Sequence, residues 1–278
     1  KDSGTLFTNI YESAQAGKVF PVDKSEIKSL DQAGFNQPKT GFLQTGNFPT
    51  WSILLDALDR IFILTVLLII FICSTIFSSE VSSGIIGLLL STKKGRTQST
   101  IAKLSAAVII SVGIFLFSQI VTTLLFQLLF GFSGWNVSVQ ANLMWHVRDF
   151  PWFINLLQVF LLTRGFQLIC VLSIVGATCM ISSITKSPFT SLAISLGGFF
   201  APQILLRVIK EGTMHTILYL FPSNNYGTET LLGLIQQSKG FLLSSVAGNL
   251  LGLIGILLLV KLLCDLLAYW RVKVYRIS

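Results

Sequence analysis

Five apolar runs of membrane-spanning length constrain the fold of this chain more than any other feature of its sequence. A helix needs about 20 consecutive apolar residues to cross the hydrocarbon core of a bilayer. Spans are predicted at about residues 58–79, 104–132, 165–185, 187–207 and 241–268. Only a tight turn separates the third and fourth runs, and Pro188 in that turn suits the first position of a helix. The pattern predicts an all-α polytopic membrane protein with five spans.

The composition excludes a soluble domain. Charged residues make up 12% of the chain, whereas about 25% is usual in soluble domains. The net charge of +8 does not indicate nucleic acid, because the basic residues flank the apolar runs and form no single aromatic-laced patch. The cysteines fall inside apolar runs, where small core residues are expected, and no metal-ligand spacing is present: Cys73, Cys170, Cys179 and Cys264.

The basic residues predict the orientation of the spans. Lys and Arg collect on the cytoplasmic side of membrane proteins. A five-span path brings three basic regions to one side, namely Lys93, Lys94, Arg96 and Lys103, then Lys186, then Arg271, Lys273 and Arg276. We therefore expect a multi-pass protein of the cell membrane, with a cytoplasmic C-terminus and the loop at about 131–152 outside.

Residues 1–57 are polar, mixed in charge and free of any run of spanning length. The predicted orientation places them outside the cell. No signal-like stretch accompanies Lys1, so we expect a further span upstream, and hence six spans in the full protein. Residues 1–57 would then be an extracellular segment between the first two spans, and residues 58–278 the transmembrane domain.

The stretch at residues 79–94 combines a small, polar stripe with an apolar body. On a helix, at about 100° per residue, one narrow face carries Glu80, Ser83, Gly84, Gly87, Ser91 and Lys94. Small residues let another backbone approach closely, and the carboxylate and the lysines suit the first and last helical turns. The pattern predicts a cytoplasmic or interfacial helix. An amphipathic linker on the membrane surface fits the pattern equally well.

The same stretch resembles the permease subunits of ABC type-2 transporters. That family has roughly E-x-x-x-G-[TI]-x-x-x-L-L-[SA]-[TS], then a basic or proline turn, an Arg, and a Lys before the next span. The matching positions are Glu80, Gly84, Leu89, Leu90, Ser91, Thr92, Arg96 and Lys103. Lys93 and Lys94 stand where the family often has a proline. The order of spans over residues 58–278 and the outer segment at 1–57 are also similar to the family.

The resemblance implies that residues 79–94 are a coupling helix that docks on a cytoplasmic ATP-binding subunit. The residues implied in coupling are Glu80, Ser83, Gly84, Gly87, Ser91, Lys93, Lys94 and Arg96. The sequence has no G-x-x-x-x-G-K-[ST] phosphate loop, so this chain is expected to bind no cofactor, and ATP and Mg²⁺ are expected in the partner subunit. The implied bacterial complex holds two ATP-binding subunits and a second permease chain, identical or related, in membrane lipid.

Arg164 is a candidate residue of the outer part of the transport pathway. It stands at the end of an apolar run and directly before the predicted third span. We expect residues 151–163 to be an outer amphipathic or half-inserted helix and the span to begin at Gly165. The long side chain of Arg164 would then reach the membrane surface.

Residues 211–240 are expected to form outer re-entrant or interfacial helices, the first of which stops at Pro222. The resemblance implies that such helices help to close the outer end of the pathway, which makes Pro222 a second candidate pathway residue. Lys261 and Asp265, four residues apart in the last span, are expected to neutralise each other.

The hypothesis that follows is the transmembrane subunit of an ATP-driven exporter for an amphipathic or hydrophobic substrate, such as a peptide, a lantibiotic or other antibiotic, or a lipid-like molecule. Two alternatives stay open. One is a membrane-embedded immunity or sensor protein that binds peptide without transport, and the other is an ATP-independent channel or carrier. An enzyme is not expected, because the sequence has only two histidines and neither a His-Glu-x-x-His nor a G-x-S-x-G motif.

Overall fold

Helices build the described part of the chain in this computed structural model. The structure describes residues 48–85, 97–131, 133–141, 150, 152, 154–236, 241–243 and 245–274, all within one unit that spans residues 44–278. The long helices are α2 (Phe48–Thr75), α5 (Gln98–Phe130), α6 (Leu156–Ile184), α7 (Pro188–Val208) and α11 (Val246–Val274). The short elements are α3 (Ser78–Ser82), the 3-10 turn η3 (Val139–Ala141), α8 (Thr213–Leu218), α9 (Pro222–Asn225) and α10 (Thr228–Gln236).

The five long helices confirm the predicted all-α polytopic membrane protein. Each is long and apolar enough to cross a bilayer. Three of them begin earlier than predicted: α2 at Phe48 instead of 58, α5 at Gln98 instead of 104, and α6 at Leu156 instead of 165. The added turns contain charged residues with oppositely charged partners in the chain, namely Asp56 with Arg60, Lys103 with Glu80, and Arg164 with Asp59, so the helices continue beyond the apolar runs. Residues 48–57 of the predicted outer segment thus belong to α2, while residues 1–47 lie outside the described residues.

The start of α6 corrects the prediction of a separate outer helix at 151–163. Asn155 Oδ1 accepts a hydrogen bond from the Gln158 backbone N–H at 2.9 Å, and Gln158 Oε1 accepts one from the Asn155 N–H at 3.0 Å. This reciprocal capping box satisfies backbone donors at the N-terminus of a helix. The helix therefore begins at Leu156 and continues without a break to Ile184.

The turn between α6 and α7 forms as predicted. Pro188 occupies the first turn of α7, and the Ser187 side chain accepts a hydrogen bond from the Thr190 backbone N–H at 3.2 Å. Proline lacks a backbone N–H that would be unsatisfied at this position. The two helices consequently run antiparallel with a connection of three residues, 185–187.

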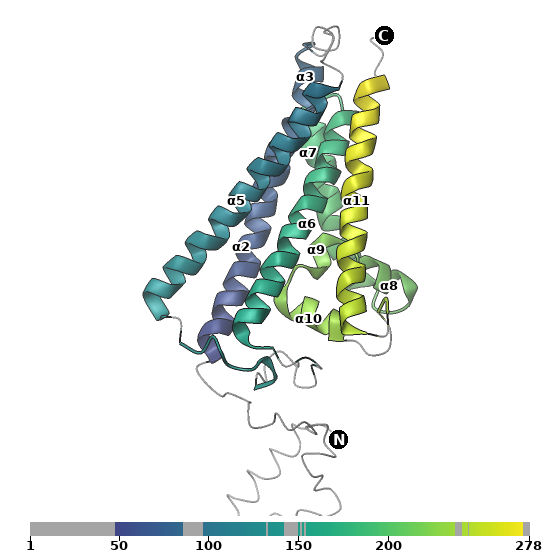
Figure 1. The fold of residues 1–278 in the computed structure, drawn as a ribbon. Coiled ribbons are helices and arrows are strands. Elements are labelled where there is room, and N and C mark those ends of the chain that lie inside the picture. The colour runs from purple at the N-terminus through teal and green to yellow at the C-terminus, as the bar shows by residue number, and fades with distance from the viewer. Residues whose placement is uncertain are drawn as a thin grey trace, which may run out of the picture. The chain divides into compact units, whose positions relative to one another are not determined.

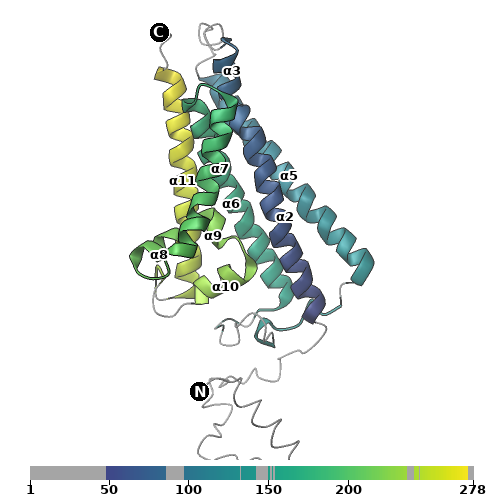
Figure 2. The ribbon, with the colours of Figure 1, turned by 180° about the vertical axis from the view of Figure 1, so that it is seen from behind.

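The long helices gather around α6, which contacts α2, α5, α7 and α11. In Figure 1, α3, the α6–α7 turn and the C-terminal end of α11 lie at one end of this bundle, and α8, α9 and α10 lie at the other. The described residues of the three basic regions, which are Lys103, Lys186, Arg271 and Lys273, belong to elements that share one end, as the five-span path requires. The cytoplasmic assignment of that end stays a prediction. Figures 1 and 2 both show α5 diverging from α2 and α6 towards its C-terminal end.

The outward faces of the bundle are apolar. Exposed side chains on α5 include Phe117, Leu128 and Leu129, and those on α11 include Leu262 and Leu266. A soluble monomer rarely exposes apolar patches of this extent, whereas hydrocarbon is the expected neighbour of such faces in a membrane. The interior is also apolar, with Leu55, Leu58 and Phe62 of α2 inaccessible to solvent. Apolar residues on both faces are typical of a helix that spans a bilayer within a bundle.

A close approach at Gly176 joins α6 to α11. A Cβ atom on Gly176 would lie 2.8 Å from Lys261 Cδ, 3.2 Å from its carbonyl oxygen and 3.3 Å from its Cα. Glycine is therefore the residue that lets the two backbones meet here. Lys261 in turn forms an ion pair with Asp265 on the same helix, which confirms the predicted i, i+4 pair.

Replacing Gly176 by valine should force α6 and α11 apart. Overpacking of this kind costs about 1–3 kcal/mol, so the melting temperature in detergent should fall by several degrees. Gly255→Val in α11 is the matched control, because a Cβ on Gly255 meets no atom within 4 Å. Equal losses of thermal stability in the two variants would contradict the assignment of the α6–α11 contact to Gly176.

Candidate functional site

A buried ion pair links α2 to α6 within the apolar bundle. Arg164 Nη2 lies 2.7 Å from Asp59 Oδ1, and the two side chains are 9% and 16% exposed. Arg164 is the ninth residue of α6, so at 1.5 Å per residue it lies about 12 Å along that helix. An unpaired charge is expensive in such surroundings, and pairing with an opposite charge offsets much of that cost.

The hydrogen bonds of Arg164 use all the donors of its guanidinium. A guanidinium has five N–H groups, and five acceptors surround this one. Nη2 donates to Asp59 Oδ1 at 2.7 Å and Thr228 Oγ1 at 3.0 Å, Nη1 to Gln167 Oε1 at 2.9 Å and Gln119 Oε1 at 3.3 Å, and Nε to Thr163 Oγ1 at 3.4 Å. The chain itself thus satisfies Arg164, whose role here is to join α2, α5, α6 and α10.

The carboxylate of Asp59 connects the same helices through its other contacts. Oδ1 accepts from Gln167 Nε2 at 2.8 Å, and Oδ2 accepts from the Thr228 backbone N–H at 2.7 Å. Gln167 Nε2 also donates to the Tyr226 carbonyl oxygen at 3.0 Å. Burial, and secondly the charge of Asp59, raises the pKa of the Tyr226 phenol. These bonds hold the start of α10 against the bundle.

The position of Arg164 is a correction. Its side chain was expected at the membrane surface, but the residue is 8% exposed and its charge is neutralised inside the bundle. Sequence reasoning also missed its partner Asp59 and the amides Gln119 and Gln167. The available signal was that Asp59 shares a helical face with the apolar residues Leu55 and Phe62, because an acid on the buried face of a helix requires a partner.

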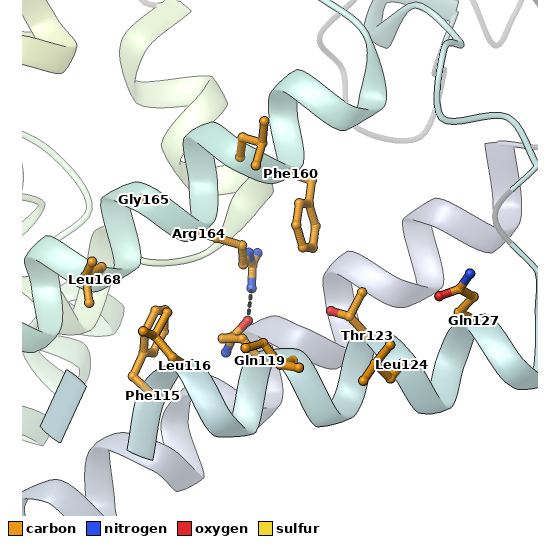
Figure 3. A pocket seen from close by; sticks show the side chains of 12 residues that line it. Phe115, Leu116, Gln119, Thr123, Leu124, Gln127, Phe160, Arg164, Gly165 and Leu168 are labelled. Atoms are coloured by element: carbon orange, nitrogen blue, oxygen red, sulfur yellow. Dashed lines mark hydrogen bonds between the residues drawn. The ribbon is translucent and has the colours of Figure 1, made fainter. Parts of the chain in front are cut away.

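A pocket of about 520 Å³ opens beside this network, between α5 and α6. Its walls are mainly apolar, and polar groups of Gln119, Thr123, Gln127 and Arg164 line it as well. Figure 3 shows Arg164 reaching from α6 towards Gln119 on α5, with Phe160 and Leu124 to one side. The pocket is lined by the part of α5 from Phe115 to Gln127, towards the end where α5 diverges from α6 (Figure 1). Apolar walls with a few polar groups suit an amphipathic ligand.

Two polar atoms of this pocket have no hydrogen-bond partner among the described residues. They are Gln119 Nε2 and Thr123 Oγ1, both buried. Because Gln119 Oε1 accepts from Arg164, the amide nitrogen is left as a free donor. A buried donor without a partner costs free energy, and a ligand with an uncharged acceptor group would remove that cost.

The two candidate pathway residues do not lie in one cavity. Arg164 lines the α5–α6 pocket, whereas Pro222 lines a smaller cavity of about 170 Å³ bounded by α2, α6, α7, α9 and α11. Pro222 begins α9, and α8 has already ended at Leu218. Proline suits the first turn of a helix, so Pro222 starts a new helix after the turn that follows α8.

The short helix α3 holds the first of the candidate coupling residues. Glu80 pairs with Lys103 of α5, and the Lys103 ammonium lies 5.4 Å from the centre of the Phe77 ring. Ser83 and Gly84 follow the helix and are exposed. Gly84 has φ = 71°, a value that favours glycine. The helix thus ends at Ser82. The stripe had predicted a helix that continues through residue 84, and that prediction was wrong at this point. Gly87, Ser91, Lys93, Lys94 and Arg96 lie outside the described residues.

Ser182 of α6 ties down the junction between α2 and α3. Its hydroxyl accepts hydrogen bonds from the backbone N–H groups of Phe77 and Ser78, both at 3.1 Å, and donates to the Ser74 carbonyl oxygen at 2.8 Å. These bonds replace the helical ones that are lost where α2 stops. The helix α3 is therefore attached to α6 as well as to α2 and α5.

No match is found when the chain is compared with protein-family models, with curated proteins and with solved structures. Among the described residues, no three His, Cys, Asp or Glu side chains gather as a metal site would require. All four cysteines are buried and free, as their apolar surroundings had suggested.

Replacing Asp59 by asparagine should destabilise the bundle strongly, because it leaves the Arg164 charge buried without a counter-ion. Breaking a buried pair from one side costs about 3–5 kcal/mol. Asp56→Asn is the matched control, since Asp56 pairs with Arg60 on the surface, where the side chains are 63% and 78% exposed, and such pairs contribute at most about 1 kcal/mol. Melting temperatures of the two variants in the same detergent test this expectation, and similar values would contradict it.

Proposed function

We propose that this chain is the transmembrane subunit of an ATP-driven ABC exporter for an amphipathic or hydrophobic substrate. The observation that carries the proposal is the attachment of α3. This helix stands at the turn between two membrane-length helices and is tied to α5 through Glu80 and Lys103, and to α6 through Ser182. A protein that binds α3 from outside could therefore displace three spans at once.

The location of α3 favours a partner that acts from one end of the bundle. α3, the α6–α7 turn and the end of α11 lie together (Figure 1), and basic residues flank this end, among them Lys103, Lys186 and Arg271. If the positive residues mark the cytoplasm, a cytoplasmic ATP-binding subunit has direct access to α3. ATP and Mg²⁺ would bind to that subunit. The complete transporter would contain two such subunits and a second permease chain.

The α5–α6 pocket supports the proposed class of substrate. Its apolar walls would accommodate a hydrocarbon or aromatic portion, and Gln119 Nε2 would donate to a carbonyl or hydroxyl oxygen. Arg164 offers no free donor, so a strongly anionic group gains little from this pocket. A peptide, an antibiotic or a lipid-like molecule has the required combination of apolar bulk and neutral polar groups.

Purification of the tagged chain with its co-expressed genomic neighbours tests the proposal. The eluate should contain a stoichiometric ATP-binding subunit and hydrolyse ATP in proteoliposomes. If the chain elutes without such a subunit, the exporter proposal is wrong, and a peptide-binding sensor or an ATP-independent channel becomes the better hypothesis.

Reversing the charge at Glu80 separates a docking role from an internal one. Glu80→Lys should weaken binding of the ATP-binding subunit by about tenfold, or about 1.4 kcal/mol, and should also lower the melting temperature. Adding Lys103→Glu restores the ion pair with reversed polarity. The double variant should therefore regain thermal stability and still bind the ATP-binding subunit poorly. Recovery of both properties would show that Glu80 acts only within the chain.

A further inference from the structure

A second pocket, of about 690 Å³, lies at the C-terminal end of α7. Residues of α8, α9 and the link between α9 and α10 complete its lining. The short helices that border it, α8, α9 and α10, lie at the end of the bundle opposite α3 (Figures 1 and 2). Its basic side chains, Arg207, Lys210 and His215, belong neither to the Asp59–Arg164 network nor to the α5–α6 pocket. Its lining is as much polar as apolar, unlike that of the α5–α6 pocket.

Three basic side chains line this second pocket. Arg207 lies in the last turn of α7, Lys210 follows two residues after that helix ends, and His215 comes from α8. No acidic side chain is among the lining residues. Neither Arg207 nor Lys210 takes part in an ion pair within the described residues. The pocket therefore concentrates positive charge that the described protein does not neutralise.

A buried hydroxyl without a partner lies in the same pocket. Ser223 is 3% exposed, and its Oγ has no hydrogen-bond partner among the described residues. The backbone around it is fixed, because the Ser223 carbonyl oxygen accepts from Gln203 Nε2 at 2.7 Å. A buried hydroxyl is normally hydrogen-bonded. Ser223 lines this pocket, as Arg207 and Lys210 do, and also the smaller cavity of about 170 Å³, so an acceptor that enters the pocket from outside the chain would complete its hydrogen bond.

A favourable interaction with the dipole of α7 explains the position of Arg207, but not the other polar residues of this pocket. A cation near the C-terminus of a helix is favourable, and Arg207 lies in the last turn of α7. That effect does not require His215 from a different helix, nor an unpartnered Ser223 in the same cavity. Arg207, Lys210, His215 and the hydroxyl share one property, which is that each can donate a hydrogen bond to an anion.

We propose that this pocket binds a phosphate group, supplied either by a lipid headgroup or by a soluble phosphate ester. Arg207 can donate two parallel hydrogen bonds to phosphate oxygens, and Lys210 adds a compact charge. Ser223 and His215 supply further donors. Ile63 and Leu206 line an apolar side of the pocket, where the carbon chain next to the phosphate can lie. The site stands at the end of a membrane-length helix, which is the depth of lipid headgroups. It does not depend on the proposed transport function.

Thermal unfolding of the full chain in detergent tests the proposal with three probes: dihexanoyl phosphatidate, dihexanoyl phosphatidylcholine and inorganic phosphate. Phosphatidate at about ten times its Kd should raise the melting temperature by about 3–6 °C. The double variant R207Q/K210Q should weaken this binding at least about tenfold. Its matched control is R60Q/K186Q, which removes the same charge at exposed positions outside the pocket.

S223A gives a test that does not alter charge. The hydroxyl has no partner in the described residues, so the variant should fold as well as the wild type and bind phosphatidate more weakly. Stabilisation by phosphatidate alone supports a lipid headgroup as the source, and equal stabilisation by inorganic phosphate supports a soluble one. Stabilisation by phosphatidylcholine, whose headgroup also contains a phosphate, supports a lipid source as well. The proposal is overturned if none of the three probes stabilises the protein, or if R207Q/K210Q binds phosphatidate as tightly as R60Q/K186Q.

Discussion

The ion pair between Asp59 and Arg164 is the interaction on which the arrangement of this bundle depends. Each charge stands in an apolar helix, and each would be costly to bury alone. Pairing the two, with Gln119, Gln167 and Thr228 completing the hydrogen bonds, allows α2 and α6 to run past their charged residues without a break. The same contacts hold α10 at one end of the bundle, and thereby position the short helices that precede it.

The two ends of the bundle are built differently. At one end the short helix α3 is held by an ion pair and by the hydroxyl of Ser182. At the other end α7, α8, α9 and α10 border a pocket with basic side chains. The helices α2 and α6 run uninterrupted between these ends, so the two ends are joined by continuous helices.

Hydrogen bonding separates the structural from the ligand-accessible polar groups of the two pockets. Arg164 has a full set of acceptors, which makes it structural although it lines a pocket. Gln119 Nε2 and Ser223 Oγ are buried without partners in the described residues, as are other interior atoms such as Ser191 Oγ and Asn249 Nδ2. Because burying a polar group without a partner costs free energy, a ligand that enters either pocket gains by completing the hydrogen bond of such an atom.

The sequence by itself determined the fold class, the number of spans, the α6–α7 turn and the Lys261–Asp265 pair. Each of these depends on composition or on residues within one helix or turn, such as Pro188 or a spacing of four. Only the tertiary structure decided that Arg164 pairs with Asp59, 105 positions away, and that the Thr228 backbone N–H donates to Asp59, 169 positions away. Nothing local indicates such pairs, because they arise when separate helices exclude water around the same charges. The helical pattern also predicted the wrong end for α3. The spacing of small residues along a stripe does not show that Gly84 adopts a positive φ, which is where the structure leaves the helix.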